Sequence, residues 1–448
     1  MVAIPRLVIA GTASSAGKTT VATGLMAAFA ARGLEVAGFK VGPDFIDPSY
    51  HALATGRPGR NLDAFLSGPE LIGPLFAAGA ADAGIAIVEG VMGLFDGASG
   101  RGELASTAQV AKLLDAPVVL VVDAAAVGRS VAATVHGFAT FDPALRIAGV
   151  IANRVGSDRH AEIVAGALDE IGVPLLGVVR RDPDLVTPSR HLGLVPASER
   201  DREARHLVTT LGQRLTGLDL DALERLARTA PELHAEAWEP WGETAPADPP
   251  VRVALAGGPA FTFLYQENLE LLTVAGAELF AFDPVAGERL PAATDALYLG
   301  GGFPEVHAEA LAANEPLRRE IAAFAAAGRP VLAECGGLLY LCRSLDGKPM
   351  CGVLDAAAVM RPHLALGYRE ATAATGSAYW TAGATVRGHE FHHSEVTPAA
   401  GASPAWALPR PEGFVQGGVH ASYLHTHWAA DPAPAMRLVA AARRAAAA

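Results

Sequence analysis

The sequence predicts an α/β protein of two domains, each built around a mainly parallel sheet. The chain has 448 residues, more than a single hydrophobic core usually organises. Short apolar runs alternate with longer segments of helical periodicity, and this alternation occurs in two series. A proline-rich stretch, WEPWGETAPADPP, lies between the series. We therefore expect a first domain at residues 1–237, a linker at 238–250 and a second domain at 251–448.

The strands of both series are mostly continuous apolar runs, which is typical of strands buried on both faces by crossover helices. In the first series a helix should follow the first strand, with Val21, Leu25 and Phe29 on its apolar face and Gly33 at its C-terminal cap. The first series comprises residues 7–11, 36–41, 85–89, 118–123, 147–153 and 175–179. The second comprises residues 251–256, 278–282, 296–299 and 331–333.

Composition limits the classes of ligand. The net charge is −12 and there is no Lys/Arg-rich run, which argues against a nucleic-acid or anionic-membrane surface and favours small molecules. No apolar run reaches the roughly 18 to 20 residues of a membrane helix, so we expect no membrane span. Three cysteines cannot all pair internally, and we expect a reducing cytoplasm.

The segment GTASSAGKTT, residues 11–20, lies between the first strand and the first helix, as a P-loop does. Five residues separate Gly11 from Gly17, one more than in the common motif, so the match is to a variant. Lys18 could reach the β- and γ-phosphates, and Thr19 could bind Mg²⁺. The alternative is a glycine-rich turn with an exposed lysine. The residues expected to bind ATP in this loop are Gly11, Thr12, Gly17, Lys18, Thr19 and Thr20.

Four acids lie at or just after the ends of the second and third strands, in KVGPDFIDPSYH and VEGVMGLFDG. Ligands of open parallel sheets collect at the carboxyl ends of strands, and Mg²⁺ prefers oxygen ligands. We expect Asp47 and Glu89, with Thr19, to bind Mg²⁺, and Asp44 and Asp96 to position the substrate. For any single acid, the alternative is that it only shapes a turn.

Asn153 ends the strand at residues 147–153 and is placed to bind an adenine edge. A turn-forming role for this asparagine is an open alternative.

In the second series, the strand at residues 331–333 leads into Cys335 at a glycine turn, the geometry that exposes a nucleophile. Backbone N–H groups of Gly301, Gly302 and Gly336 could bind an oxyanion, and His425 near the chain end could act as the base. A lone cysteine is more often an inert buried thiol, but strand, turn, glycine run and histidine agree here. Cys342 and Cys351 lack these surroundings and are assigned to packing. The cysteine spacing also argues against a zinc site.

Together, GTASSAGKTT, KVGPDFIDPSYH, EGVMGLFDG, GGGFPE, AECGG and SYLHTHW resemble the cobyrinate/hydrogenobyrinate a,c-diamide synthases of cobalamin biosynthesis. The resemblance covers nearly the whole chain. It implies an ATP-dependent synthetase domain of the dethiobiotin synthetase type, followed by a class I glutamine amidotransferase domain. The segment RGHEFHHS, residues 387–394, resembles the signature of these synthases rather than the pattern of the sister cobyric acid synthases.

The resemblance implies a ligase that uses glutamine, ATP and a corrinoid polycarboxylic acid, with Mg²⁺ as cofactor and an acyl-phosphate intermediate. It also implies that His389 and Glu390 contact the substrate, and it suggests a homodimer. One departure concerns the glutaminase, because His427 stands where class I triads carry a glutamate. Either Cys335 and His425 act as a pair, or a different acid orients His425.

Two other functions remain open on the sequence alone. One keeps both half-reactions with another acceptor, as in cobyric acid synthase or an enzyme that amidates a cell-wall lipid. The other is a regulatory P-loop ATPase of the partitioning type, whose second domain would be non-catalytic.

Overall fold

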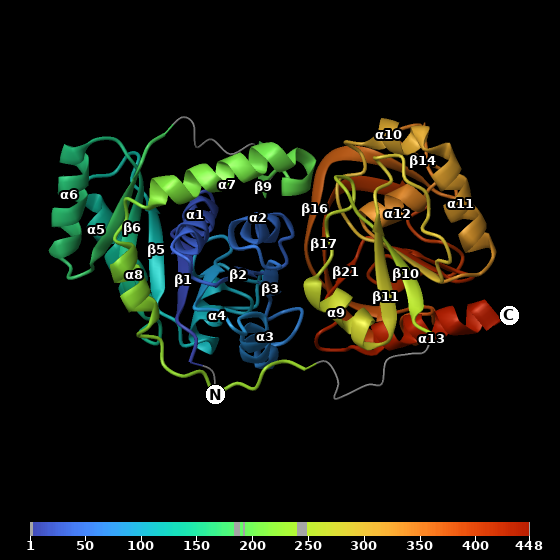
Figure 1. The fold of residues 1–448 in the computed structure, drawn as a ribbon, viewed down its shortest axis with the longest axis horizontal. Coiled ribbons are helices and arrows are strands. Elements are labelled where there is room, and N and C mark those ends of the chain that lie inside the picture. The colour runs from blue at the N-terminus through green and yellow to red at the C-terminus, as the bar shows by residue number, and fades with distance from the viewer. Residues whose placement is uncertain (1–2, 183–188, 191–192, 240–248, 448) are drawn as a thin grey trace. The chain divides into compact units, whose positions relative to one another are not determined.

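The computed structural model describes residues 3–182, 189–190, 193–239 and 249–447 (Figure 1). The chain divides into two compact units, Met1–Trp238 and Glu239–Ala448. Of the expected linker at residues 238–250, residues 240–248 lie outside the described residues.

The first unit contains a seven-stranded sheet in the order β3-β2-β4-β1-β5-β6-β7, and every neighbouring pair is parallel. This confirms the predicted parallel sheet. The bounds of the six predicted strands differ from the observed bounds by at most two residues. Strand β3 was not predicted. The strands are β1 (Arg6–Gly11), β2 (Val36–Val41), β3 (Arg60–Leu62), β4 (Ile85–Glu89), β5 (Val118–Asp123), β6 (Ile147–Val155) and β7 (Leu175–Arg180), with a separate pair β8 (Ser189–Arg190) and β9 (Gly193–Leu194).

Helix α1 (Lys18–Ala31) follows the phosphate loop and buries Val21, Leu25 and Phe29 as expected. Most of its other residues are also buried, because α7 (Asp201–Leu215) packs along it (Figure 1). A Cβ added at Gly24 would lie 2.0 Å from Leu215 Cδ1, so the close approach of the two helices requires this glycine. The other helices of the unit are α2 (Ile46–Thr55), α3 (Ile72–Gly79), α4 (Thr107–Leu113), α5 (Ser130–Phe141), α6 (Asp158–Asp169) and α8 (Leu220–Ala227).

The second unit contains two sheets. The first has the order β11-β10-β12-β13-β20-β19 and is parallel except for the antiparallel pair β19 and β20. Its strands are β10 (Val251–Ala256), β11 (Ala277–Phe282), β12 (Ala296–Leu299), β13 (Val331–Glu334), β19 (Phe414–Gln416) and β20 (Val419–Ser422).

The second sheet has the order β15-β14-β16-β17-β21, and its largest part is an antiparallel hairpin of two long strands. Its strands are β14 (Ser344–Leu345), β15 (Lys348–Pro349), β16 (Ala357–Ala373), β17 (Thr385–Thr397) and β21 (His425–Thr426), and β18 (Trp406–Ala407) pairs with β16. The helices of the unit are α9 (Gln266–Val274), α10 (Ala308–Ala313), α11 (Glu315–Ala326), α12 (Gly336–Leu341) and α13 (Ala433–Ala447).

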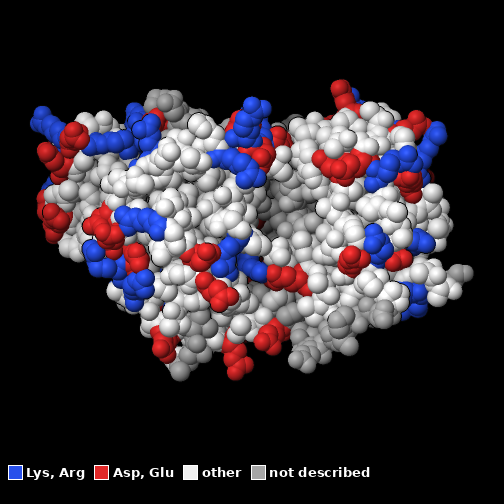
Figure 2. Space-filling view, in the orientation of Figure 1, with Lys and Arg blue, Asp and Glu red and all other residues white. Residues whose placement is uncertain are grey.

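On the visible face of each unit, basic and acidic side chains are interspersed (Figure 2). Among the helices of the described residues, none combines the length and the apolar character needed to cross a bilayer.

Candidate functional site

The phosphate loop connects β1 to α1 and is braced from β6. Gly17 has a φ of 100°, a conformation that favours glycine, and a Cβ there would lie 2.0 Å from Asn153 Nδ2. Asn153 is buried, and its Nδ2 donates to Ala16 O at 2.9 Å. Asn153 therefore supports the loop, and its contact with adenine stays a prediction.

Lys18 folds back over the same loop, where its Nζ donates to Ala13 O at 3.1 Å. Burial, followed by the nearby ammonium of Lys40, lowers the pKa of Lys18 to about 8. Lys18 is thus a buried cation in the loop, whereas the turn alternative expected an exposed lysine.

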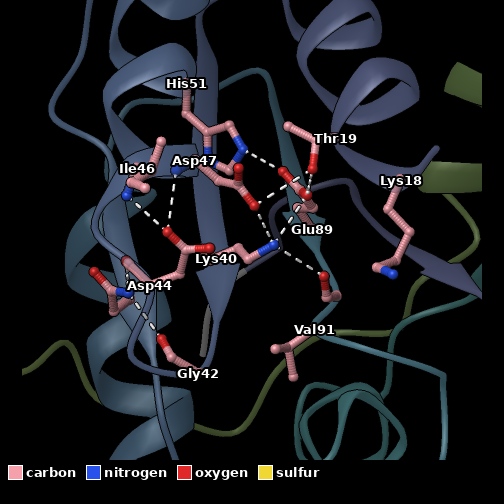
Figure 3. A network of polar contacts seen from close by, with 12 residues as sticks. Lys18, Thr19, Lys40, Gly42, Asp44, Ile46, Asp47, His51, Glu89 and Val91 are labelled. Atoms are coloured by element: carbon pink, nitrogen blue, oxygen red, sulfur yellow. Dashed lines mark hydrogen bonds and ion pairs between the residues drawn. The ribbon is translucent and has the colours of Figure 1, made fainter. Parts of the chain in front are cut away.

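Next to the loop is a largely buried cluster that includes the three predicted magnesium ligands, Thr19, Asp47 and Glu89 (Figure 3). Thr19 Oγ1 donates to Glu89 Oε1 at 2.5 Å and lies 3.4 Å from Asp47 Oδ2. Lys40 Nζ lies between the two carboxylates, 2.5 Å from Asp47 Oδ2 and 2.9 Å from Glu89 Oε1. On its other oxygen, Glu89 contacts His51 Nε2 at 2.7 Å.

The pKa values of Asp47 and Glu89 differ, although both buried carboxyl groups contact the ammonium of Lys40. Burial alone would raise the pKa of Glu89, but Lys40 and the contact with His51 hold it below its usual range. Burial, together with the charges of Asp44 and Glu89, raises the pKa of Asp47 well above normal. Burial would lower the pKa of Lys40, but the two carboxylates raise it above its usual range. Glu89 is therefore the carboxylate that stays ionised most firmly.

Sequence reasoning missed Lys40 and His51, although both lie in the KVGPDFIDPSYH segment. Each is almost fully buried. The available signal was a lysine inside the apolar strand VAGFKV, because a buried cation must be paired. Its partner could not be identified without knowing that β2 and β4 are neighbours, with Lys40 in register with Glu89.

Asp44 and Asp96, the predicted substrate-positioning acids, make their observed bonds within loops. Asp44 Oδ1 accepts from the backbone N–H of Ile46 at 2.7 Å and of Asp47 at 3.2 Å, at the start of α2. Asp96 Oδ2 accepts from Gly93 N at 3.0 Å. These contacts agree with the turn-shaping alternative, and the substrate roles stay predictions.

The oxygen atoms around Lys40 also bear on magnesium. Asp47 Oδ2 and Glu89 Oε1 both contact Lys40 Nζ, and Thr19 Oγ1 lies next to both oxygens. All three are hard oxygen ligands of the kind that Mg²⁺ prefers. Within the described residues, no group of three or more His, Cys, Asp or Glu side chains is arranged to hold a metal. Binding of Mg²⁺ by these oxygens together with phosphate oxygens, the usual arrangement for this ion, stays a prediction.

In the second unit, Cys335 occupies a strained elbow between β13 and α12. Its φ is 47° and its ψ is −97°, a conformation that non-glycine residues rarely adopt. Cys335 N donates to Ser422 O at 2.8 Å, which ties the elbow to β20. Burial raises the pKa of the Cys335 thiol above its usual range, so its activation requires a neighbouring base.

His425 lies against the glycine run that was predicted to form the oxyanion hole. A Cβ at Gly301 would lie 2.2 Å from His425 Cε1, and a Cβ at Gly336 would lie 3.0 Å from Gly302 N. The cysteine elbow, the glycine run and His425 are thus brought together. Burial lowers the pKa of His425 to about 3, so the imidazole is neutral and is a weaker base than a solvated histidine.

The role of Gly301 needs correction. Its N–H donates to Phe263 O at 3.2 Å, in a β-bridge between these residues, and is not available as an oxyanion donor. Gly302 and Gly336 remain the candidate donors, and Gly301 instead makes room for His425.

The RGHEFHHS segment forms part of β17, beside the base. His389 is in register with His425, and the two rings stack with centroids 4.9 Å apart and planes 10° apart. His389 Nε2 lies 3.0 Å from Tyr265 Oη. Glu390 pairs with Arg369 at 2.9 Å. The structure therefore places His389 beside the glutaminase base, and direct contact of either residue with the corrinoid stays a prediction.

His427, which replaces the usual triad glutamate, pairs with Glu267 at 3.3 Å. The other two cysteines, Cys342 and Cys351, are buried in the core of the second unit, as their assignment to packing predicted.

Comparison with known proteins covers both units. Residues 7–195 match the family described as the CobQ/CobB/MinD/ParA nucleotide binding domain, and residues 252–433 match the CobB/CobQ-like glutamine amidotransferase domain. The hydrogenobyrinate a,c-diamide synthase of Streptomyces coelicolor is 58% identical, over 98% of this chain and 97% of that protein. The protein of the same name from Thermobifida fusca is 53% identical, over 98% and 97%. The cobyrinate a,c-diamide synthase of Syntrophotalea carbinolica is 46% identical, over 97% and 98%. This chain belongs to the cobyrinate/hydrogenobyrinate a,c-diamide synthase family.

Proposed function

We propose that this protein amidates the a and c carboxylates of a corrinoid acid, using ATP to activate each carboxylate and glutamine to supply ammonia. The observation that carries the proposal is the presence of two different sites in one chain. One unit has a phosphate loop beside a buried acid cluster, and the other has a cysteine elbow beside a neutral histidine.

In the first unit, the substrate carboxylate attacks the γ-phosphorus of ATP to give an acyl phosphate and ADP. Ammonia then displaces phosphate to form the amide. Lys18 and the N–H groups of the phosphate loop bind the transferring phosphoryl group, and Thr19 and Glu89 hold the metal site. When bound there with Asp47, Mg²⁺ would neutralise charge on the β- and γ-phosphates.

In the second unit, His425 takes the Cys335 proton as the thiolate attacks the glutamine amide. Gly302 and Gly336 donate to the oxyanion, His425 returns the proton to the leaving ammonia, and water hydrolyses the thioester to glutamate. The match of this unit to a glutamine amidotransferase family argues against a partitioning ATPase with a non-catalytic second domain.

Two variants test whether glutamine hydrolysis and carboxylate activation take place in different units. Cys335→Ser should abolish glutamine-dependent amidation and leave ammonia-dependent amidation within about threefold of wild type, because the acyl phosphate forms in the other unit. Lys18→Ala should reduce amidation with either donor by about 10²-fold or more. Equal loss with both donors in Cys335→Ser, or normal ammonia-dependent turnover in Lys18→Ala, would contradict the proposal.

The preferred acceptor is a narrower proposal. The two more similar relatives named above are hydrogenobyrinate synthases, which supports hydrogenobyrinic acid over cobyrinic acid. Measuring kcat/KM for both acids with ammonia as the donor tests this choice, and an equal or higher value for cobyrinic acid would reject it. The homodimer also stays a prediction, which sedimentation velocity would test.

A further inference from the structure

The glutaminase site described above brings together residues from two different sheets. Cys335 follows β13, in the mainly parallel sheet, whereas His425 belongs to β21, which pairs with β17 in the other sheet. Attack on an amide requires the thiol and the imidazole to be aligned, and an error of about 1 Å can cost about 10²-fold in rate. Something must therefore fix the register between the two sheets at this point.

The residues next to the nucleophile and the base are bonded to each other. Glu334 directly precedes Cys335, and Thr426 directly follows His425. Glu334 Oε1 accepts from Thr426 N at 3.1 Å and from Thr426 Oγ1 at 2.9 Å. Both residues are buried, so these bonds are shielded from water and join the two sheets directly.

Further contacts hold both partners in place. Tyr298 Oη donates to the other Glu334 oxygen, Oε2, at 2.9 Å. Trp428 Nε1 donates to Thr426 Oγ1 at 2.9 Å, and its ring stacks on Tyr298. Asn268 Nδ2 donates to Thr426 O at 2.9 Å. The Glu334 carboxylate is therefore the centre of a buried network between the elbow and the base strand.

We propose that Glu334 is a positioning residue of the glutaminase, which holds the His425 strand in register with the Cys335 elbow through its two hydrogen bonds from Thr426. In this enzyme, the acid that serves the base comes from the nucleophile strand and acts on the adjacent backbone. The inference rests on the proposed glutaminase function. It explains how His425 is positioned although His427 stands where class I triads carry a glutamate.

Three variants test the proposal with glutamine hydrolysis as the assay. Glu334→Ala should lower kcat by about 10²-fold with KM for glutamine within about threefold, because alignment and not binding is lost. Thr426→Val keeps the backbone N–H bond and should lower kcat by about tenfold. Glu334→Gln keeps an oxygen acceptor for Thr426, and it should retain at least about a tenth of the wild-type rate.

Alkylation by iodoacetamide, mapped by mass spectrometry on the full-length chain, separates positioning from loss of packing. If Glu334 positions the base, Glu334→Ala should lower the alkylation rate of Cys335 and leave Cys342 and Cys351 protected. The proposal is overturned if Glu334→Ala hydrolyses glutamine at a rate within about threefold of wild type. It is also overturned if Glu334→Ala loses glutamine hydrolysis and its Cys342 and Cys351 become reactive, because the packing of the unit is then lost. Absence of glutamine hydrolysis in the wild-type protein would instead reject the proposed function.

Discussion

Lys40 Nζ lies between the carboxylates of Asp47 and Glu89, at 2.5 Å and 2.9 Å from their oxygens. All three side chains are buried, so the ammonium compensates charges that water does not reach. Lys40 holds the pKa of the Glu89 carboxyl below its usual range, whereas burial and the neighbouring carboxylates still raise the pKa of Asp47. Lys40 thus sets the charge state of the site in which we place phosphoryl transfer.

Replacing Lys40 with methionine should be costly for both folding and activity. Removing one partner of a buried ion pair leaves uncompensated charge and typically destabilises a protein by about 3–5 kcal/mol. We expect Lys40→Met to lower the free energy of unfolding by an amount of this order, measured by urea denaturation. Ammonia-dependent amidation should fall by about 10²-fold or more, because Thr19 and Glu89 lose their arrangement.

Lys112→Met is the matched control for Lys40→Met. Lys112 also pairs with two carboxylates, those of Glu103 and Asp142, but in contact with solvent. Water replaces the lost partner there, so stability and activity should stay close to wild type. A Lys40→Met protein as stable and active as this control would show that Asp47 and Glu89 do not need the ammonium.

The contact between Gly301 and His425 predicts a selective defect. A Cβ at position 301 would lie 2.2 Å from His425 Cε1, so Gly301→Ala must displace the base. We expect glutamine hydrolysis to fall by about 10²-fold while ammonia-dependent amidation is retained. Gly257→Ala is the control, since its Cβ would meet no atom closer than 3.7 Å. Normal hydrolysis by Gly301→Ala would place His425 away from the reaction.

His389→Phe separates two roles for the RGHEFHHS segment. Phenylalanine keeps a ring against His425 but removes the contact with Tyr265 Oη. If His389 supports the glutaminase, glutamine hydrolysis should fall by about tenfold and KM for the corrinoid acid should not change. If His389 binds the corrinoid acid, as the resemblance implied, KM for that acid should rise in the ammonia-dependent reaction.

Sequence alone predicted the elements that are buried and repetitive. Most parallel strands of both units could be found because a strand buried on both faces is largely apolar, whereas the short parallel strands β3 and β20 were not predicted. The hairpin of β16 and β17 was not predicted, because its exposed and buried residues follow no regular alternation and the register shifts between Met360 and Ala365. Its signature residues were found by resemblance instead.

The site was predictable where chemistry is local and not where it depends on strand order. The residues from Gly17 to Thr19 and the Cys335 turn are short motifs, and the structure places them at the start of α1 and at an elbow. Lys40 and Glu334 were missed because their partners are distant in sequence, Glu89 on β4 and Thr426 on β21. Single charged residues at the ends of apolar strands were the available signal.

The buried carboxyl of Glu412 predicts a pH dependence of stability. Burial raises its pKa to about 7, although it accepts hydrogen bonds from Tyr423 N and Ser422 Oγ. A carboxyl whose pKa is higher in the folded state stabilises the fold most below its unfolded pKa, and this stabilisation is lost as pH rises towards 7. Glu412→Gln should remove this loss, which is up to about 3 kcal/mol.

Urea denaturation at pH 5 and pH 8 measures this effect. The stability of Glu412→Gln relative to wild type should be greater at pH 8 than at pH 5. An equal difference at the two pH values would show that Glu412 has the same pKa in the folded and unfolded states.

Glu89 and Asp96 should fail in different ways, since their contacts differ. Glu89 bonds Thr19 and Lys40 inside the acid cluster, whereas Asp96 bonds the backbone of Gly93 in its loop. Glu89→Gln should therefore raise the Mg²⁺ concentration needed for half-maximal ammonia-dependent turnover and slow both amidations.

Asp96→Asn keeps an oxygen acceptor for Gly93 N, so the loop should hold while the charge that we propose orients the acceptor is lost. Misplacing the acceptor by about 1 Å costs about 10²-fold in rate. Because two carboxylates must react in turn, the poorer one should suffer more, and the variant should release monoamide at an unchanged Mg²⁺ requirement. Chromatographic separation of monoamide from diamide during single and multiple turnovers measures this ratio. If Asp96→Asn shifts the Mg²⁺ requirement as Glu89→Gln does, Asp96 belongs to the metal site; if it changes neither quantity, it only shapes the loop.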